Sequence, residues 1–295
     1  MSKIYLPQNV YDAALQRIHR IYEEFPNVVV GFSGGKDSTV VLNLTLQVAR
    51  ERSRLPVRVL FIDQEAEWQT VIDYIRRTMR REDVEPLWLQ CPIRIFNATS
   101  AVEPWLHCWD PERESDWIRP KEPQSYQVNR YGTDRFHAMF NAFILTEYPN
   151  TKTCILGGVR VEESPQRLVG LTGAPTYKDI TWGKVVRSPT HYIFYPLYDW
   201  SYRDIWKAIH DNGWDYCRIY DYMYQRGVPL QNMRVSNVHH ETAVYSLFYL
   251  HELEPETWNR IQARISAVNL AAQFGHADFF GEPTLPEVFA SWREY

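Results

Sequence analysis

The spacing of apolar residues along the chain alternates between a helical period and short continuous runs. Residues 9–25 place their apolar side chains on one face of a helix, and Pro26 ends that pattern. The β-branched run Val28–Val30 follows at once and is typical of a buried strand, after which residues 40–50 return to the helical period. The first fifty residues therefore predict a helix, a strand and a second helix.

The same alternation continues downstream. The further predicted elements are strands over 57–62, 86–91 and 153–156, and helices over 68–81, 134–148 with Thr133 as N-cap, and 202–212 with Ser201 as N-cap, Asp204 at N3 and Gly213 as its stop. Repeated strand–helix units of this kind build a parallel sheet with helices on both faces. We therefore predict an α/β fold with a doubly wound, mainly parallel five-stranded sheet.

Two stretches depart from the alternation. Residues 92–130 mix tryptophan and tyrosine with several prolines, and an irregular segment of this length is usually a functional loop or lid. Its tryptophans either stack on a base or simply pack in the core. Beyond Trp214 the chain becomes rich in tyrosine over 216–224 and then helical. The predicted organisation is a nucleotide-binding α/β domain over 1–214, with 92–130 as an insert, and a smaller helical appendage over 215–295.

The first candidate site lies between the first strand and its helix. Two glycines, Gly34 and Gly35, let backbone N–H groups approach an oxyanion, and the following helix N-terminus adds unpaired donors and positive dipole charge. Lys36 supplies a point charge, and the hydroxyls of Ser33, Ser38 and Thr39 supply further donors. The pattern predicts a phosphate site. It is not a Walker A loop, because Gly31 is only four positions before Gly35 and Asp37 stands where the hydroxyl residue should be.

Two more polar segments follow predicted strands. Asp63 opens an acidic run to Glu67 just past a strand's carboxyl end, where open α/β sheets bind ligands. The strand at 153–156 runs into a glycine turn, Gly157-Gly158, with Arg160 and Arg167 beyond it. Two guanidinium groups can grip a phosphate or sulfate, or they can be surface arginines on a loop.

These segments together resemble a known family. Ser33–Ser38 is similar to the PP-loop of ATP pyrophosphatases and of phosphoadenosine phosphosulfate (PAPS) reductases. Gly158–Arg167 and Tyr195–Trp206 resemble two later elements of the PAPS reductase group, the second of them a strand feeding a helix, and the resemblance covers about residues 10–215. It implies a fold of the adenine nucleotide α-hydrolase (HUP) type that binds ATP or PAPS at the carboxyl ends of the strands.

The residues assigned to this site follow from the loop and from the resemblance. The candidate catalytic residues are Lys36, Asp37 and Arg160. The candidate nucleotide-binding residues are Ser33, Gly34, Gly35, Lys36, Asp37, Ser38, Thr39, Asp63, Gly158, Arg160, Glu163, Ser164 and Arg167. Asp37 and Asp63 are the candidate neighbours of Mg²⁺, which usually bridges phosphates with one or two carboxylates.

Three functions are compatible with the resemblance. One is cleavage of ATP between its α- and β-phosphates, which adenylates an acceptor and releases pyrophosphate. The second is PAPS reduction, with PAPS or adenosine 3′,5′-bisphosphate as ligand, but that chemistry needs a thiol near the C-terminus and the chain has no cysteine after Cys217. The third is a nucleotide-sensing regulator. The resemblance favours the reductase-like branch of phages and prophages. Some members of that branch act beside ParB-like partners, which implies a protein or a nucleic acid as acceptor.

Composition narrows the remaining classes. A net charge of -4 argues against a protein held on nucleic acid by bulk positive charge. The four cysteines form no C-x-x-C pair, so neither zinc nor an iron–sulfur cluster is expected. No apolar run is long enough for a membrane span or a signal peptide, and a cytoplasmic location is expected. A homo-oligomer remains compatible with the sequence.

Overall fold

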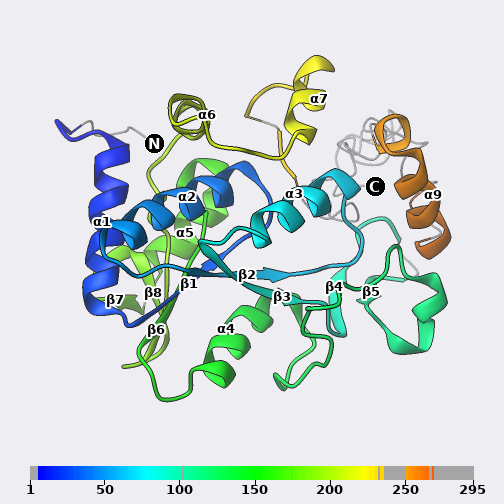
Figure 1. Cartoon of the computed structure of the whole chain (residues 1–295), viewed down its shortest axis with the longest axis horizontal. Helices are drawn as coiled ribbons and strands as arrows, with labels where there is room; N and C mark the ends of the chain where they lie inside the picture. The colour runs from blue at the N-terminus through cyan, green and yellow to red at the C-terminus, as the bar shows by residue number, and fades with distance from the viewer. Residues whose placement is uncertain are drawn as a thin grey trace, which may run out of the picture.

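The computed structural model describes residues 6–100, 103–173, 175–231, 233–235, 250–265 and 268. Within them the central sheet has seven strands (Figure 1). Their order across the sheet is β3 (Val84–Leu89), β2 (Val57–Ile62), β1 (Asn27–Gly31), β6 (Thr153–Leu156), β9 (His191–Phe194), β8 (Ile180–Arg187) and β7 (Thr176–Tyr177). The first five are parallel to one another, which confirms the predicted mainly parallel sheet.

The far edge of the sheet departs from the prediction. β8 runs antiparallel to β9, and β7 pairs antiparallel with β8, so this pair extends the five parallel strands to seven. The fifth parallel strand is β9, which ends at Phe194, so Tyr195–Trp206 begins just after the strand it was expected to contain. Gly183 in β8 is required by close packing, since a Cβ there would lie 2.6 Å from a ring carbon of Phe194.

Helices cover both faces of the sheet. Figure 1 shows α2 and α3 on one face and α4 on the other, as a doubly wound fold requires. The helices are α1 (Val10–Glu24), α2 (Lys36–Glu51), α3 (Gln69–Met79), α4 (Phe136–Glu147), α5 (Pro165–Thr172), α6 (Tyr202–Asp211), α7 (Ile219–Gln225) and α9 (Pro255–Arg264), with short 3₁₀ turns η1 (Pro111–Asp116) and η2 (Val161–Glu163). The ranges predicted for α1, α2, α3 and α6 are confirmed within a few residues.

The predicted N-cap is correct for α6 and wrong for α4. Ser201 and Asp204 form the predicted capping box at the start of α6, and Gly213 lies past its end with a φ of 60°. The predicted cap of α4 is wrong. That helix begins at Phe136 with Arg135 at the N-cap position, and the hydroxyl of Thr133 instead accepts a hydrogen bond from the Arg135 N–H at 3.2 Å.

The insert over 92–130 is irregular but not without structure. It contains an antiparallel pair, β4 (Ile93–Phe96) and β5 (Trp105–Cys108), followed by η1. Trp109 is fully buried, and its indole N–H donates to the Asp63 carbonyl at 2.8 Å, so this tryptophan packs in the core. Phe96 and Trp105 are exposed and meet edge to face.

The described residues beyond 214 share the core of the α/β part. Cys217, Ile219 and Tyr220 at the start of α7 are buried in the same hydrophobic cluster as the sheet, and so is Trp258 of α9. The division at residue 214 stays a prediction. Among the described residues, none of the helices is both long and apolar enough to cross a lipid bilayer.

Candidate functional site

The loop between β1 and α2 has the shape of an anion cradle. Gly34 has a φ of +72°, and a Cβ there would lie 3.0 Å from the side chains of Val71 and Ile75 on α3. Only glycine fits both the left-handed backbone and the close approach of α3. Gly35 caps α2 without a side-chain hydrogen bond, so the helix N-terminus is not covered by its own cap residue.

The loop hydroxyls hold the loop itself. Ser38 and Thr39 donate from Oγ and Oγ1 to the Gly35 carbonyl at 2.9 and 3.0 Å, and the Oγ atoms of Ser33 and Ser38 lie 3.2 Å apart. Their assignment as phosphate donors stays a prediction. The structure gives them a role in fixing the turn from which the backbone N–H groups project.

Lys36 is buried and reaches residues far along the chain. Its ammonium donates to the carbonyl of Met233 at 3.0 Å and lies 3.2 Å from Oδ2 of Asp37. Its backbone N–H donates to the hydroxyl of Tyr220 at 3.0 Å. Burial raises the pKa of Tyr220 well above its ordinary value, so the hydroxyl stays neutral. A phenol oxygen therefore lies where the first free N–H of α2 would otherwise meet an anion.

Arg160 completes this group through Asp37. Its Nε donates to Oδ1 of Asp37 at 2.5 Å, and its Nη1 donates to Glu162 at 3.1 Å and to the Trp200 carbonyl at 3.3 Å. Burial alone would lower the pKa of this guanidinium, but Asp37 and the glutamates hold it above its usual range. Arg160 is therefore bound to the protein's own carboxylates and positions Asp37.

Gly158 explains how the second motif meets the first. A Cβ at this position would lie 2.9 Å from the carbonyl carbon of Asp37 and 3.0 Å from the nitrogen of Ser38. The backbone after β6 thus packs directly on the first turn of α2, and a side chain would push the two apart. The structure brings these two predicted segments into contact although more than a hundred residues separate them.

The outer residues of the second motif surround the same ion pairs. Ser164 caps α5, its Oγ accepting from the Arg167 N–H at 3.3 Å, and the exposed Arg167 side chain pairs with Glu163 at 3.5 Å. Burial, then the nearby Asp37, raises the pKa of Glu163. Arg234 donates to the Glu163 carbonyl at 3.1 Å. We call Lys36, Asp37, Arg160, Glu163 and Tyr220 the loop cluster.

A second polar group occupies the carboxyl end of β2. Asp63 is fully buried and accepts four hydrogen bonds, from Trp88 Nε1 at 2.9 Å, Gln90 Nε2 at 3.0 Å, the Glu65 N–H at 2.9 Å and Arg119 at 2.5 Å. Glu65, also fully buried, pairs with Arg264 of α9 at 2.8 Å. We call Asp63, Glu65, Glu67, Arg119 and Arg264 the β2-end cluster.

Glu67 is the unusual member of this cluster. Burial, and then the charge of Asp63, raises the pKa of Glu67 to about 8, so it holds a proton at neutral pH. Sequence reasoning noted the acidic run but missed the two arginines that neutralise it. Their positions, 56 and 199 residues from their partners, follow no local pattern.

The carboxylates do not fit a protein-held Mg²⁺. Oδ1 of Asp37 is bound to Arg160 and Oδ2 to Lys36, and Asp63 would have to give up one of its four hydrogen bonds. Among the described residues no group of three histidine, cysteine, aspartate or glutamate side chains is arranged to hold a metal ion. The expectation that Asp37 and Asp63 hold magnesium therefore disagrees with the contacts of both residues.

A glycine loop at a helix N-terminus, on the carboxyl edge of a mainly parallel sheet, defines an α/β protein of the PP-loop class. The phosphoadenosine phosphosulfate reductase domain matches residues 27–227. The chain belongs to that family. A domain of unknown function (DUF3440) matches residues 227–295.

Two curated proteins and one solved structure are similar to the chain. The uncharacterized protein YbdN of Escherichia coli strain K12 is 31% identical over 99% of this chain and 75% of its own length. Sulfate adenylyltransferase subunit 2 of Vibrio parahaemolyticus is 26% identical over 65% of this chain, which spans 60% of that protein. The crystal structure of Candida glabrata FMN adenylyltransferase, 18% identical, covers 80% of this chain with a TM-score of 0.46, and the chain covers 65% of it.

Proposed function

We propose that the chain binds an adenine nucleotide on the loop of residues 33–39 and cleaves ATP between its α- and β-phosphates. The acceptor oxygen attacks the α-phosphorus, the bond to the bridging oxygen of the β-phosphate breaks, and pyrophosphate leaves with the electron pair. The observation that carries the proposal is the cradle itself. Gly34 holds its left-handed turn, the start of α2 has no side-chain cap, and the buried ammonium of Lys36 lies beside it.

The cradle's groups have distinct tasks in this reaction. Backbone N–H groups at the start of α2 and the Lys36 ammonium offset the charge that develops on the leaving pyrophosphate. The ammonium is held by a neutral carbonyl, that of Met233, and by one carboxylate, so a polyphosphate offers it a stronger partner. Arg160 anchors Asp37 and so fixes the direction of the first turn of α2. Tyr220 has to leave the Lys36 N–H when phosphate arrives.

The thiols argue against the reductase alternative. All four cysteines of the chain are buried. Burial raises the pKa of Cys91 to about 11 and of Cys217 to about 12, and it also raises the pKa of Cys108 and Cys154. A buried thiol with a raised pKa is a poor nucleophile at neutral pH. PAPS or adenosine 3′,5′-bisphosphate is therefore proposed only as an alternative ligand of the same cradle.

A regulator without turnover is the second candidate. It is favoured by the closed state of the cradle, in which Tyr220 and Met233 occupy the groups that a phosphate would use. A nucleotide that displaces them would move the chain after α6, and a ParB-like partner could read that movement. The nature of the acceptor, protein or nucleic acid, and membership of the phage branch stay predictions.

Thermal unfolding with ligand tests the proposal, because a ligand of the folded state raises the melting temperature. ATP with and without Mg²⁺, PAPS and adenosine 3′,5′-bisphosphate are compared on the wild type, on Lys36→Ala and on the control Lys207→Ala, which changes an exposed lysine of α6. We expect ATP to stabilise the wild type and Lys207→Ala but not Lys36→Ala. Equal stabilisation of all three would remove the loop assignment.

Pyrophosphate release then separates enzyme from sensor. Release from ATP by the wild type, lost in Lys36→Ala, supports cleavage at the α–β bond. Stabilisation by ATP without any release, tested with protein and oligonucleotide acceptors, supports the regulator. If PAPS and adenosine 3′,5′-bisphosphate stabilise the protein more than ATP does, the ligand of the cradle is a sulfonucleotide and not ATP.

A further inference from the structure

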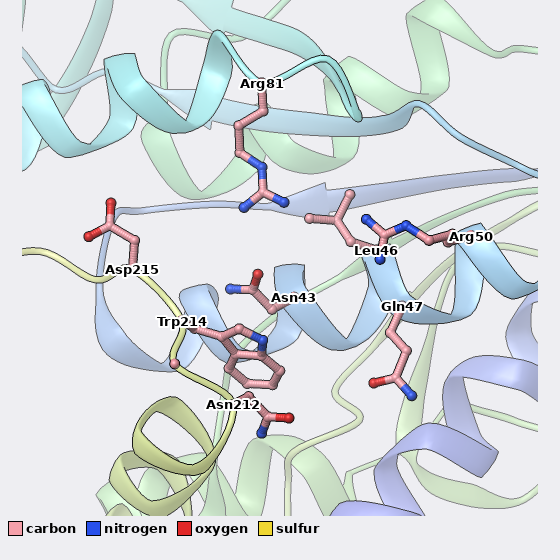
Figure 2. Close-up of a pocket in the computed structure, with 9 residues that line it drawn as sticks. Asn43, Leu46, Gln47, Arg50, Arg81, Asn212, Trp214 and Asp215 are labelled. Carbon is pink, nitrogen blue, oxygen red and sulfur yellow. The ribbon is translucent and has the colours of Figure 1, made fainter.

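A separate pocket lies beside the second half of α2, from Asn43 to Arg50, and not at the phosphate loop. It has a volume of about 380 Å³ and lies among α2, the end of α3 and the segment that follows α6. Figure 2 shows Arg81, Asn43 and Trp214 approaching its centre from these three elements. The loop cluster contributes none of its lining residues.

The guanidinium groups of this pocket have donors to spare. Arg81 binds Asp83 through Nε and Nη2 at 2.8 and 2.9 Å, and Arg50 binds the same carboxylate through Nη2 at 3.1 Å. Among the described residues this leaves Nη1 of Arg81 and both Nε and Nη1 of Arg50 without a protein acceptor. One carboxylate thus serves two guanidiniums, and a phosphate or carboxylate of a ligand would use the remaining N–H groups.

The rest of the lining carries an indole, three amides, Leu46, Gly213 and Asp215, whose carboxylate is paired with Arg77 at 3.3 Å. Trp214 presents an indole, and Asn43, Gln47 and Asn212 present primary amides. Asn43 donates from Nδ2 to the Thr39 carbonyl at 2.9 Å, which directs its amide oxygen elsewhere. An aromatic face, amide groups and guanidiniums are the side chains that bind the ring, the ring edge and the phosphate of a nucleotide. The volume lies within the range of small-molecule sites.

A chain of hydroxyls joins this pocket to the phosphate loop. The Tyr74 hydroxyl lies 3.1 Å from the carbonyl of Asp215, a pocket residue, and 2.9 Å from Oγ1 of Thr39. Oγ1 of Thr39 in turn lies 3.0 Å from the carbonyl of Gly35, the cap of α2. Three oxygen–oxygen contacts share only two hydroxyl protons, so they cannot all be hydrogen bonds at once. If Tyr74 donates to Asp215, Thr39 can donate either to Tyr74 or to Gly35. If Tyr74 instead donates to Thr39, Thr39 can donate only to Gly35.

We propose that this pocket binds a mononucleotide, and that its occupancy is coupled to the phosphate loop through Tyr74. A ligand that draws the Asp215 carbonyl away from Tyr74 turns the Tyr74 hydroxyl toward Thr39, and Thr39 then donates to Gly35 alone. The hydrogen bond from Thr39 to Gly35, the cap of the helix that follows the loop, is then fixed, whereas without the ligand Thr39 can exchange between Gly35 and Tyr74. The binding part is independent of the proposed function, and the coupling part rests on nucleotide binding at the loop.

Binding is tested on the full chain carrying Lys36→Ala, so that loop binding is removed. Calorimetric titration with AMP, GMP, CMP and UMP is expected to show one site. Arg50→Glu in that background should weaken it at least tenfold, whereas Arg80→Ala, a neighbouring exposed arginine outside the pocket, should leave it unchanged. Arg50 is 62% exposed, so this variant should fold, which its melting temperature checks. No binding to Lys36→Ala, or equal binding by Arg50→Glu, would overturn the site.

Coupling is tested on a chain with an intact loop. The mononucleotide that binds the Lys36→Ala chain best should change the affinity of the wild type for a non-hydrolysable ATP analogue by about fivefold or more. Tyr74→Phe should bring that factor close to one while retaining both binding events. Tyr11→Phe is the matched control, since its hydroxyl contacts Gln47 and Asn212 of the pocket lining but no residue of the loop. A factor of one in the wild type, or an unchanged factor in Tyr74→Phe, would refute the coupling and leave the pocket result standing.

Discussion

The loop cluster and the β2-end cluster both lie at the carboxyl ends of parallel strands. They differ in the hydrogen-bond partners of their charged groups. In the β2-end cluster Asp63 and Glu65 are fully buried, and donors of this chain fill the oxygens of Asp63. In the loop cluster Lys36 is held by a carbonyl and one carboxylate, and the helix N–H is held by a phenol. The first set is closed by the protein, whereas the second has partners that an anion can replace.

Acidic residues at the carboxyl edge of the sheet can therefore be structural and need not bind a ligand. Acids after a strand are a reasonable signal of a ligand site in this fold. At the end of β2 that signal instead marks the anchor of the insert, through Arg119, and of α9, through Arg264. Changes in the β2-end cluster should therefore alter stability first, and changes in the loop cluster should alter ligand response first.

The largest effect is expected from Arg264→Ala. This change leaves the buried Glu65 without its ion-pair partner, and breaking a buried pair from one side typically costs about 3–5 kcal/mol. The free energy of unfolding from urea titration measures it. Arg260→Ala on the same helix removes one hydrogen bond, to the Ile118 carbonyl, and should cost roughly 1 kcal/mol. Equal losses in both variants would contradict the contrast between the clusters.

The next effect is a pH dependence that Glu67 imposes. Its pKa in the folded chain, about 8, lies above the ordinary value of 4.5, so between these values the folded state keeps a proton that the unfolded chain releases. The free energy of unfolding should therefore fall as pH rises through this window, by up to about 1.4 kcal/mol per pH unit, and level off above it.

Glu67→Gln replaces the protonated carboxyl group by a neutral amide of the same shape. The free energy of unfolding should then fall less with rising pH. The comparison is urea unfolding of both chains at several pH values, with Glu256→Gln, an exposed glutamate of α9, as the control. A decline that persists in Glu67→Gln would assign the pH dependence to another group.

A smaller effect is expected from Gly158→Ala, which inserts a methyl group against the backbone of Asp37 and Ser38. Overpacking of this kind usually costs about 1–3 kcal/mol, and here it should also weaken the response to ATP by moving the start of α2. In Gly170→Ala the new methyl group meets nothing within 4 Å, so melting temperature and ligand response should hold or rise slightly. A stable Gly158→Ala chain with normal ATP response would show that the approach of the two motifs is not needed.

The smallest change in stability is expected from Tyr220→Phe. This variant should be slightly less stable than the wild type but should bind the ATP analogue more tightly. Losing one hydrogen bond costs about 1 kcal/mol, whereas the Lys36 N–H becomes free for a phosphate. The melting temperature without ligand should fall and the affinity for the ATP analogue should rise. Tyr224→Phe changes an exposed residue of the same helix and should alter neither. A Tyr220→Phe chain with weaker ATP binding would place the phenol among the ligand's own contacts.

Much of this fold could be predicted because its signals are local. The apolar runs of β1, β2 and β6, the helical periods of α1 to α3 and the capping box of α6 each lie within a few consecutive residues. No strand is predicted at β8, although its apolar and β-branched residues from Ile180 onward are a fair strand signal. Thr133 does not cap α4, because its hydroxyl accepts from the N–H of Arg135 in a local turn and the helix begins two residues later than expected.

Only the motif residues of the site could be predicted from the sequence, and their partners could not. The loop's glycines, lysine and hydroxyls lie together in sequence, and so do Gly158 and Arg160. The partners of these residues do not: Tyr220, Met233, Arg119 and Arg264 reach the sheet edge from distant segments with no recognisable spacing. Tertiary packing, not local pattern, decides that Asp37 binds Arg160 and that Asp63 is saturated.

The contact between Lys36 and Met233 spans 197 residues of chain. During synthesis, α2 and the strands beside it leave the ribosome long before Tyr220 and Met233 exist, so a nascent chain exposes an anion cradle that nothing of its own can yet cover. Nucleotides or inorganic phosphate in the surrounding solution would meet that cradle first. The segment that carries Tyr220 and Met233 is made later than α2, so an anion bound at the loop would compete with that segment during folding.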